Sequence, residues 1–324
     1  MLRLPDSWVW DSWYAAEPAG DGGVRHHAFY LRASRGLRDP ERRHRHPFVG
    51  HAVSGDLQTW EVLPDALAIS EPPAFDDWTT WTGSVARDDD GRWWMAYTGS
   101  SHADEGLVQR IGFAVSADLL VWDKADPSSV IEADPRWYEK RGDTEWPDEA
   151  WRDPFLLRDE DGWHLLVTAR ANEGPVLGRG VVGHVTSPDL REWTVQPPIT
   201  LPDNGFGQLE VVQVEIVDGV PTMVFCCMAA QLDEVGLARH GTGGVFSVTG
   251  DSLLGPYDIA SARRFPHDSL YAARLVRLES GWQLIGFDLG TEEAFAGELV
   301  DPIPVTCRPG VGLVRADVSH PTRS

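Results

Sequence analysis

The chain has 324 residues, of which 42% are hydrophobic and 10% aromatic, so it can bury a large core. Its formal net charge of −22 gives an acidic surface that repels nucleic acids and anionic membranes, which argues against both as partners. The 15 tryptophans, 32 glycines and 23 prolines occur without a long 3.6-residue hydrophobic period, which favours an all-β fold with many turns.

Five segments have the pattern of a β-hairpin, in which two apolar, β-branched stretches flank a short polar turn. The first is less regular, with a glycine-rich turn at residues 20–23 that leads into residues 27–31. In the third hairpin, Pro154 cannot donate a ladder hydrogen bond, which places it among the first residues of its strand and Asp153 at the strand mouth. The four regular hairpins cover residues 83–99, 151–170, 210–228 and 271–288.

A shorter motif follows each of the first four hairpins. It reads GHAVSGDLQTW at residues 50–60, GFAVSADLLVW at 112–122 and GHVTSPDLREW at 183–193, with a weaker copy, FSVTGDSLLGPY, at 246–257. Small and β-branched residues predict a strand, Ser and Asp predict a turn, and the aromatic residue anchors the next strand.

The hairpins and motifs together make five units of roughly 60 to 70 residues. Four-stranded units that repeat around an axis are the blades of a β-propeller, so the sequence predicts an all-β, five-bladed β-propeller. A solenoid is the structural alternative, but it needs shorter repeats and capping units. We expect one domain over residues 1–324, with a polar tail at residues 317–324 that is frayed unless it helps to close the ring.

Features that report on the compartment favour a cytoplasmic protein. The first residues, MLRLPDSWVWDSW, lack a basic region followed by an apolar run, so no secretory signal is expected. No apolar run approaches the roughly 20 residues that span a bilayer. Cys226 and Cys227 are adjacent in an apolar segment and Cys307 is distant, which predicts buried free thiols rather than metal ligands. We expect neither a metal nor a cofactor.

Three carboxylates lie at predicted mouths of innermost strands: Asp11, Asp153 and Glu210. Innermost strands line the central channel of a propeller, so these side chains should converge on one pocket. Glycoside hydrolysis needs such a pair or trio, because one carboxylate attacks or activates water while another stays protonated for the leaving oxygen. Mutual repulsion and partial burial raise one pKa to allow that division. Tryptophans supply apolar faces for sugar C–H groups.

Four motifs resemble glycoside hydrolase families 32 and 68, the clan of invertases, inulinases and levansucrases. Residues 9–13, VWDSW, look like the nucleophile segment of levansucrases, and residues 50–60 resemble a segment of invertases and inulinases. Residues 81–84, WTGS, resemble the sugar-binding W-S-G-S segment, and residues 151–154, WRDP, match the R-D-P motif. The resemblance spans nearly the whole chain and implies retaining fructosyl hydrolases and transferases on five-bladed propellers.

The resemblance assigns a role to each carboxylate. It makes Asp11 the nucleophile that forms a fructosyl-enzyme intermediate, and Glu210 the acid/base. Asp153, with Arg152 beside it, would hold sugar hydroxyl groups and stabilise the oxocarbenium-like transition state. Trp78 could be a platform for the leaving group or a core residue. The candidate substrate-binding residues are Trp10, Trp78, Trp81, Thr82 and Arg152.

The sequence also departs from the family pattern. The family's Glu-Cys-Pro or Glu-Arg-Pro is here Glu210-Val211-Val212, and Glu215 is a competing acid/base. Glu215 lies an odd number of positions from Glu210, which predicts opposite faces of a regular strand. The invertase W-M-N-D-P-N-G pattern is absent, and Leu31 stands where its following glutamine is expected. We also expect no C-terminal β-sandwich.

Other polar clusters are predicted to be structural. The basic run at residues 42–46 is expected to be a solvated loop, with anion binding at the pocket rim as the alternative. Asp88-Asp89-Asp90 is predicted to be a hairpin turn rather than a calcium site, because it lacks spaced oxygen ligands. His102, Asp104 and Glu105 are weaker candidates for shaping the pocket.

We therefore predict a retaining β-fructofuranosidase-like glycosidase that acts on a small β-fructoside such as sucrose or a fructo-oligosaccharide, with water or a sugar as acceptor. One alternative is an inverting, arabinosidase- or xylosidase-like propeller hydrolase. A second is a glycoside phosphorylase whose basic run at residues 42–46 binds phosphate. A third is a sugar-binding propeller that has lost catalysis. The sequence does not indicate an oligomeric state.

Overall fold

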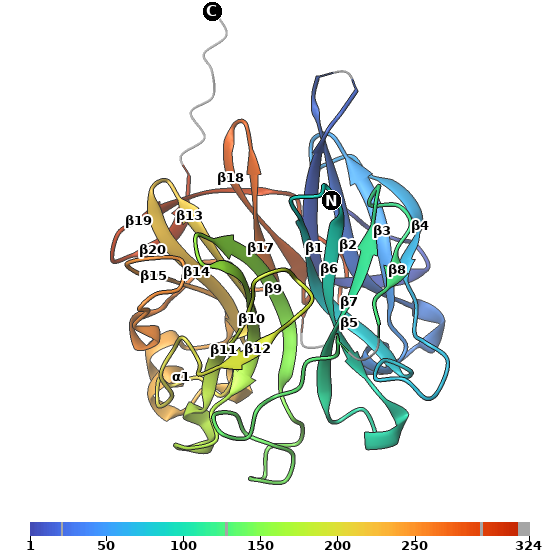
Figure 1. Ribbon diagram of the computed structural model, residues 1–324. Coiled ribbons are helices and arrows are strands. Elements are labelled where there is room, and N and C mark those ends of the chain that lie inside the picture. Colours follow the sequence, from blue (N-terminus) through green and yellow to red (C-terminus); the bar gives the residue numbers. More distant parts are fainter. Residues whose placement is uncertain (21, 127–128, 292–293, 317–324) are drawn as a thin grey trace, which may run out of the picture.

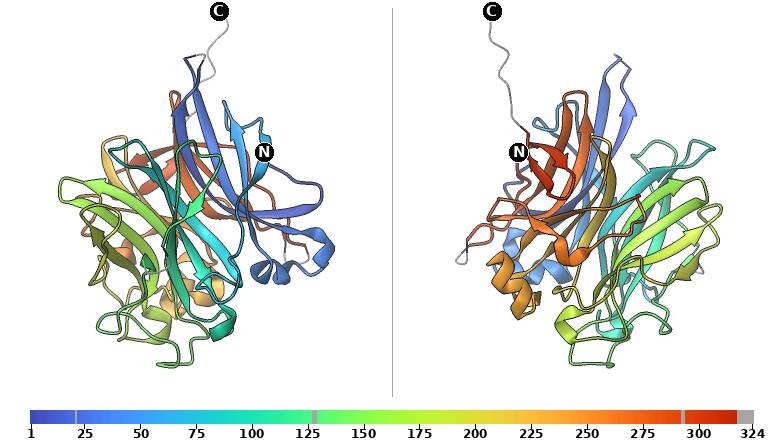
Figure 2. Two further views of the ribbon diagram at one scale, coloured as in Figure 1. Left: turned by 45° about the vertical axis from the view of Figure 1, so that its right-hand side comes forward. Right: turned by 90° about the vertical axis from the view of Figure 1, so that its left-hand side faces the viewer.

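Five four-stranded antiparallel sheets make up the computed structural model, which describes residues 1–20, 22–126, 129–291 and 294–316. Each sheet consists of four strands that are consecutive in the sequence. The sheets stand around a common centre, and the N-terminal blade lies beside the C-terminal one in every view (Figures 1 and 2). The predicted five-bladed β-propeller is confirmed, whereas the predicted polar tail at residues 317–324 lies outside the described residues.

The strand bounds follow the predicted hairpins closely. Blades 1 and 2 contain β1 (Ser7–Pro18), β2 (Val24–Ser34), β3 (Phe48–Ser54), β4 (Glu61–Leu67), β5 (Thr79–Arg87), β6 (Trp93–Ser100), β7 (Gln109–Ser116) and β8 (Asp123–Lys124). Blade 3 contains β9 (Trp151–Asp159), β10 (Gly162–Arg170), β11 (Gly180–Ser187) and β12 (Thr194–Gln196). Blades 4 and 5 contain β13 (Glu210–Val217), β14 (Val220–Cys227), β15 (Gly244–Thr249), β16 (Arg263–Arg264), β17 (Leu270–Leu278), β18 (Gly281–Asp288), β19 (Ile303–Arg308) and β20 (Gly312–Arg315).

Helical segments are short and lie in the connections between strands. The one α-helix among the described residues is α1 (Glu234–His240), and none there is long and apolar enough to cross a membrane. The 3₁₀ segments are η1 (Arg35–Leu37), η2 (Pro40–Arg45), η3 (His102–Asp104), η5 (Val176–Gly178), η6 (Ala229–Gln231) and η7 (Ile259–Ser261).

The repeated motif forms the same turn in three blades. In the third copy, the Ser187 hydroxyl accepts a hydrogen bond from the Leu190 N–H at 2.9 Å, and the Asp189 carboxylate accepts from the next two N–H groups. The turn places Leu190 in a left-handed conformation, φ 66°, with its side chain buried. The equivalent leucines of the other two copies, Leu57 and Leu119, have φ values of 60° and 64°. The repeat is therefore a three-dimensional unit.

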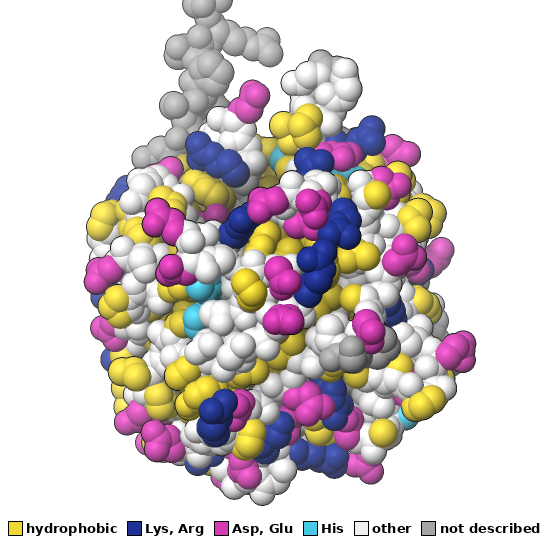
Figure 3. Space-filling model, in the orientation of Figure 1, with side chains coloured by type: hydrophobic (Ala, Val, Ile, Leu, Met, Phe, Trp, Pro, Cys, Tyr) yellow, Lys and Arg dark blue, Asp and Glu magenta, His cyan; other side chains and the backbone are white. Residues whose placement is uncertain are grey.

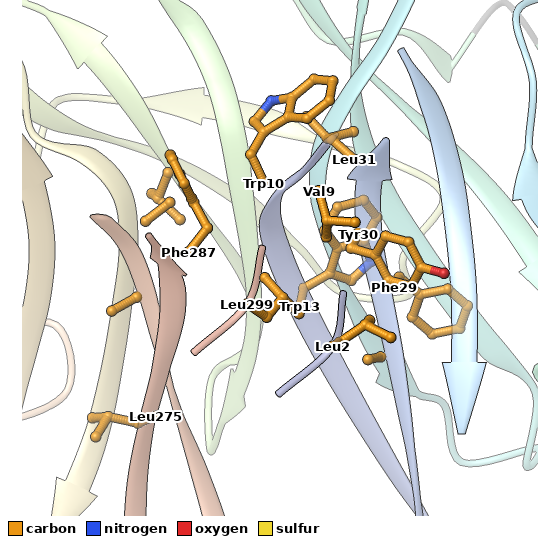
Figure 4. Close-up of a cluster of buried hydrophobic side chains, with 14 of the residues drawn as sticks. Leu2, Val9, Trp10, Trp13, Phe29, Tyr30, Leu31, Leu275, Phe287 and Leu299 are labelled. Carbon is orange, nitrogen blue, oxygen red and sulfur yellow. The ribbon is translucent and has the colours of Figure 1, made fainter. Parts of the chain in front are cut away.

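The ring closes through side-chain packing between the last blade and the first. The innermost strands β1, β5, β9, β13 and β17 contact one another in that order, and β17 and β18 contact β1. One buried cluster spans this junction, with Trp10 and Leu31 on the first blade and Phe287 on the last (Figure 4). A single bridge between Leu2 and Leu299 adds the N-terminal segment to the junction.

Figure 3 shows how charge is distributed on one face of the molecule. On the face in Figure 3, acidic side chains are scattered over the blades with basic ones among them. The three cysteines are free and buried, as the sequence predicts. Among the residues that the structure describes, no group of three or more His, Cys, Asp or Glu side chains is arranged to hold a metal ion.

Candidate active site

A β-bulge interrupts the innermost strand of every blade at the same level of the channel. In each blade the register of the first two strands shifts by one residue, so that the inner strand carries one residue more than its partner. Bulges bend a strand and redirect side chains, which is why they occur beside active sites. The shifts fall at Trp10/Ser12 on β1, Trp81/Gly83 on β5, Arg152–Phe155 on β9, Glu210/Gln213 on β13 and Tyr271/Arg274 on β17.

A cavity of about 660 Å³ opens above this ring of bulges. Its lining includes all three predicted carboxylates, Asp11, Asp153 and Glu210, from blades 1, 3 and 4. Four of the five predicted substrate-binding residues also line it: Trp10, Trp81, Thr82 and Arg152. The structure therefore brings together residues that are up to about two hundred positions apart in the sequence.

Asp11 is the extra residue of the β1 bulge and has a φ of 28°, which turns its side chain into the cavity. The Thr82 hydroxyl donates a hydrogen bond to Asp11 Oδ2 at 2.5 Å. Burial, followed by the negative charge of Asp153, raises the pKa of Asp11 to about 7, and Glu210 adds to this effect. Thr82 and Arg43 oppose the rise. Near neutral pH, Asp11 can therefore exist in both protonation states.

Asp153 lies at the β9 bulge with a φ of 56° and is 4% exposed. Its Oδ2 atom accepts hydrogen bonds from the Thr168 hydroxyl at 2.8 Å and from the Val211 N–H at 3.3 Å. Arg152 Nε lies 3.6 Å from the same oxygen. A carboxylate fixed by several donors is suited to holding a ligand in one orientation rather than to moving during a reaction.

Glu210 begins β13, and both of its oxygens are engaged. Arg152 Nη2 donates to Oε1 at 2.7 Å, and the Tyr271 hydroxyl donates to Oε2. Arg152 is fixed in turn by the side-chain oxygens of Gln208 at 2.5 Å and Gln109 at 3.1 Å. Burial lowers the pKa of Arg152, but the charges of Glu210, Asp148 and Asp153 outweigh it and raise that pKa, so the guanidinium stays charged.

Three members of this network were missed by the sequence reasoning: Tyr271, Gln208 and Gln109. Tyr271 could have been found, because it lies at the start of the inner strand of the fifth blade, just as Asp11, Asp153 and Glu210 lie near the starts of inner strands in blades 1, 3 and 4. The two glutamines lie at other positions, Gln208 before β13 and Gln109 at the start of β7, and no sequence pattern marks them.

Glu215 does not line the cavity, as expected. The expected reason, that Glu215 and Glu210 lie on opposite faces of the strand, is wrong. The bulge between Glu210 and Gln213 inserts one residue, so Glu210 pairs with Cys226 and Glu215 with Thr222. Their partners are an even number of positions apart, and the two glutamates therefore share a face of the strand. Distance along β13 separates Glu215 from the site, and burial raises the pKa of Glu215.

Trp78 is the predicted site residue that does not line the cavity. Its indole stacks on the His102 ring, with ring centroids 4.5 Å apart, and the Arg45 guanidinium lies over it at 4.8 Å. Trp81 does line the cavity, and its indole N–H donates to the His44 carbonyl at 3.0 Å. Asp104 of the weaker candidates is paired with Arg110 at 2.6 Å and also lies outside the lining.

The basic run at residues 42–46 is only in part the solvated loop that the sequence predicts, because Arg42 and His46 alone are exposed. Most of it belongs to η2, which places Arg43 and His44 in the cavity lining. Arg43 is 7% exposed, lies 4.1 Å from the centre of the Phe295 ring, and donates to Glu41 Oε1 at 2.9 Å. Pro40 and the Asp39 cap stabilise this short helical turn. The Asp-Pro pair could have predicted the turn, but the expectation was based on the charges alone.

Comparison with known proteins identifies related sequences. The family model described as the N-terminal domain of glycosyl hydrolases family 32 matches residues 24–261. An insoluble β-fructofuranosidase isoenzyme of Arabidopsis thaliana is 27% identical over 259 residues, which are 72% of this chain and 44% of that protein. Sucrose-6-phosphate hydrolase of Zymomonas mobilis is 30% identical over 149 residues, 44% of this chain and 26% of that protein. The matches thus cover less than half of these two curated relatives.

Solved structures share the fold. The inulosucrase of Halalkalicoccus jeotgali superposes with a TM-score of 0.73 at 21% identity, covering 97% of this chain and 91% of the inulosucrase. Bacillus subtilis levansucrase gives a TM-score of 0.72 at 15% identity, with 97% and 87% covered. With a family model that matches most of its length, this chain belongs to the glycosyl hydrolases of family 32, in the part described as their N-terminal domain.

Proposed function

We propose that the protein is a retaining enzyme that transfers the fructosyl group of a small β-fructoside to water or to a hydroxyl group of a second sugar. The observation that carries this proposal is the convergence of Asp11, Asp153 and Glu210, from three blades, on one cavity of about 660 Å³. Such a volume suits a small saccharide. Membership of family 32 supports the fructosyl group, as do relatives named as β-fructofuranosidases and a solved relative described as bound to kestose.

In the first step, a carboxylate oxygen of Asp11 attacks the anomeric carbon. The bond between that carbon and the leaving oxygen breaks, and Glu210 gives its proton to the leaving oxygen. Asp11 suits attack because it faces the cavity and, among the described residues, its side chain is bonded only at Oδ2, by the Thr82 hydroxyl. The contacts of Arg152 and Tyr271 to the two oxygens of Glu210 are those of the ionised carboxylate that remains after the proton has been given up.

In the second step, Glu210 takes a proton from water or from an acceptor hydroxyl, whose oxygen attacks the anomeric carbon and releases Asp11. Positive charge develops on the sugar ring in both steps. Asp153, which is buried and fixed by Thr168 and the Val211 N–H, lies in position to stabilise that charge and to hold ring hydroxyl groups. Trp10 and Trp81 offer apolar faces to the sugar.

The leaving group would lie against the mostly apolar part of the cavity lining. This part includes Leu31, Phe287 and Phe295, together with the buried guanidinium of Arg43. Arg43 Nε is buried without a hydrogen-bond partner among the described residues, so it can donate to an oxygen of the leaving sugar.

A substrate panel tests the proposal. Sucrose, kestose, difructose anhydride and aryl glycosides are each incubated with the enzyme, with and without inorganic phosphate, and proton NMR follows the first-formed product. We expect fructoside turnover without phosphate and with net retention at the anomeric carbon. Inversion would instead support the arabinosidase-like alternative, phosphate dependence would support a phosphorylase, and binding without turnover would support a sugar-binding propeller.

Two variants assign the roles in the same assay. Asp11→Asn and Glu210→Gln should each lower kcat by about a hundredfold or more while the thermal unfolding transition stays cooperative. Glu215→Gln is the matched control, because Glu215 shares the strand face of Glu210 but lies outside the cavity, and it should keep wild-type turnover. Near-normal activity of the Asp11 variant would overturn the mechanism.

A further inference from the structure

The peptide that follows Glu210 has a strained backbone. Val211 has a φ of 54°, a left-handed conformation that a β-branched residue rarely adopts, and its side chain is 3% exposed. It occupies the β13 bulge, where the register shifts. Such strain persists in a folded protein when surrounding contacts fix it, and it is found at functional sites.

The strained conformation directs the Val211 N–H toward the neighbouring blade. This N–H lies 3.3 Å from Asp153 Oδ2 and 3.2 Å from the Thr168 hydroxyl. The residue after one candidate catalytic carboxylate therefore holds another. An unstrained strand conformation would rotate the peptide and remove this donor from Asp153.

Arg274 holds the next two peptides of the same bulge. It follows the bulge of β17, is 3% exposed, and donates through Nη1 to the Val212 carbonyl at 2.5 Å and, more weakly, to the Val211 carbonyl at 3.4 Å. Its Nη2 lies 3.5 Å from the carbonyl of Gly83, the residue next to Thr82. One side chain thus joins the bulges of blades 2, 4 and 5.

The charge of Arg274 faces the carboxylates. Burial lowers its pKa to about 10, while the charges of Asp153 and Asp11 act in the opposite direction, so the guanidinium remains protonated at neutral pH. The other titratable groups that act on it are Cys226 of β14 and Tyr14 of β1. Toward the lower channel it meets uncharged residues, among them Phe155, Gln213 and Leu275. A buried cation near Asp11 favours the ionised form of that carboxylate.

We propose that Arg274 is a positioning residue: it fixes the strained backbone at Val211 so that Asp153 and Glu210 keep their orientation, and its charge favours the ionised form of Asp11. The roles of those carboxylates rest on the proposed function. The contacts and the charge of Arg274 do not, and they can be tested apart from turnover. Arg274 itself lies outside the cavity lining, so it acts through the residues that it holds.

The charge is tested by carboxyl titration. Aspartate labelled with ¹³C at the carboxyl carbon is followed by NMR from pH 4 to 9 in the wild type and in Arg274→Met, with Asp11→Asn to assign the signal of Asp11. We expect the Asp11 midpoint to rise in Arg274→Met and to stay near the wild-type value in Arg274→Lys. An unchanged midpoint in Arg274→Met would overturn the electrostatic part whether or not fructosides are substrates.

The positioning is tested by kinetics and rescue. Arg274→Met should lower kcat by about tenfold to a hundredfold and leave KM within about threefold, because the substrate contacts remain. Val211→Gly keeps the N–H and tolerates the left-handed backbone. The double variant Arg274→Met/Val211→Gly should therefore recover part of the kcat that Arg274→Met loses. Arg170→Met is the structural control, because Arg170 is another buried arginine that links two blades. This variant should have a lower melting temperature, while the fall of kcat/KM at acid pH should be the same as in the wild type.

Two outcomes would contradict the positioning role. One is an Arg274→Met variant whose loss of kcat matches its loss of folded protein. The other is a double variant with no recovery. If Arg274→Met does not fold, Arg274→Lys and Val211→Gly decide the question. Val211→Gly keeps the N–H that binds Asp153, so its loss of kcat should be smaller than that of Arg274→Lys, and an equally large loss would count against the proposal.

Discussion

At the scale of single residues, the charge of the buried Asp11 carboxylate lowers the stability of the folded protein. Asp11 is close enough to Asp153 and Glu210 for their charges to raise its pKa, after burial, from 3.8 to about 7. The folded protein therefore binds a proton at Asp11 more tightly than the unfolded chain does. Between about pH 4 and 7 this linkage makes stability fall as the pH rises, which is the opposite of the usual aspartate.

This sign gives a prediction for Asp11→Asn. The amide keeps the shape of the protonated carboxyl and removes the buried charge, so the variant should melt a few degrees higher than the wild type at pH 8, and the difference should be smaller at pH 5. Differential scanning calorimetry at both pH values measures the effect. Asp161→Asn, at an exposed hairpin turn, is the control and should change neither value. A variant less stable than the wild type at pH 8 would show that Asp11 is a net stabilising group.

The same pKa governs activity. The nucleophile must be ionised, so kcat/KM should fall as the pH drops below about 7, with Asp11 as the titrating group.

At the scale of elements, the hairpins and turns could be read from the sequence, whereas the bulges could not. Hairpins are encoded locally by alternating apolar residues and by turn residues such as Asp218-Gly219. A bulge depends on how neighbouring blades pack against the inner strand. Reasoning from strict alternation therefore put Glu215 on the wrong face of β13, although it chose the correct glutamate for the cavity.

The repeated turn allows a prediction about stability. Asp189 accepts hydrogen bonds from the N–H groups of Arg191 and Glu192, which also lower its pKa. Asp189→Ala leaves these donors to the solvent and should lower the free energy of unfolding by about 1 kcal/mol without changing turnover. Urea unfolding followed by tryptophan fluorescence measures the change. Asp161→Ala in the same blade lacks such bonds and should differ little from the wild type, and equal losses in both variants would contradict this account of the turn.

At the scale of the whole molecule, the repeats were sufficient to predict the number of blades, because each blade is built from consecutive strands. They were also sufficient to predict that Asp11, Asp153 and Glu210 meet, since inner strands of a propeller face one channel. The residues that hold the carboxylates could not be predicted from the sequence. In the sequence, Arg274 does not differ from other arginines on strands, because its contacts are made with other blades. Arg43 reaches the cavity through η2, a connection that is not part of the repeat.

The convergence of three blades on one cavity also makes the reaction path testable on the intact protein. In Glu210→Gln, a fructosyl fluoride can still react with Asp11, because fluoride leaves without a proton. The second step is slow without the base, so the intermediate should accumulate. Intact mass spectrometry should then show the protein heavier by one fructosyl residue, and peptide mapping should place the adduct on Asp11 of β1. Turnover of the fluoride with no adduct, or an adduct on another residue, would contradict the assignment of Asp11 as the nucleophile.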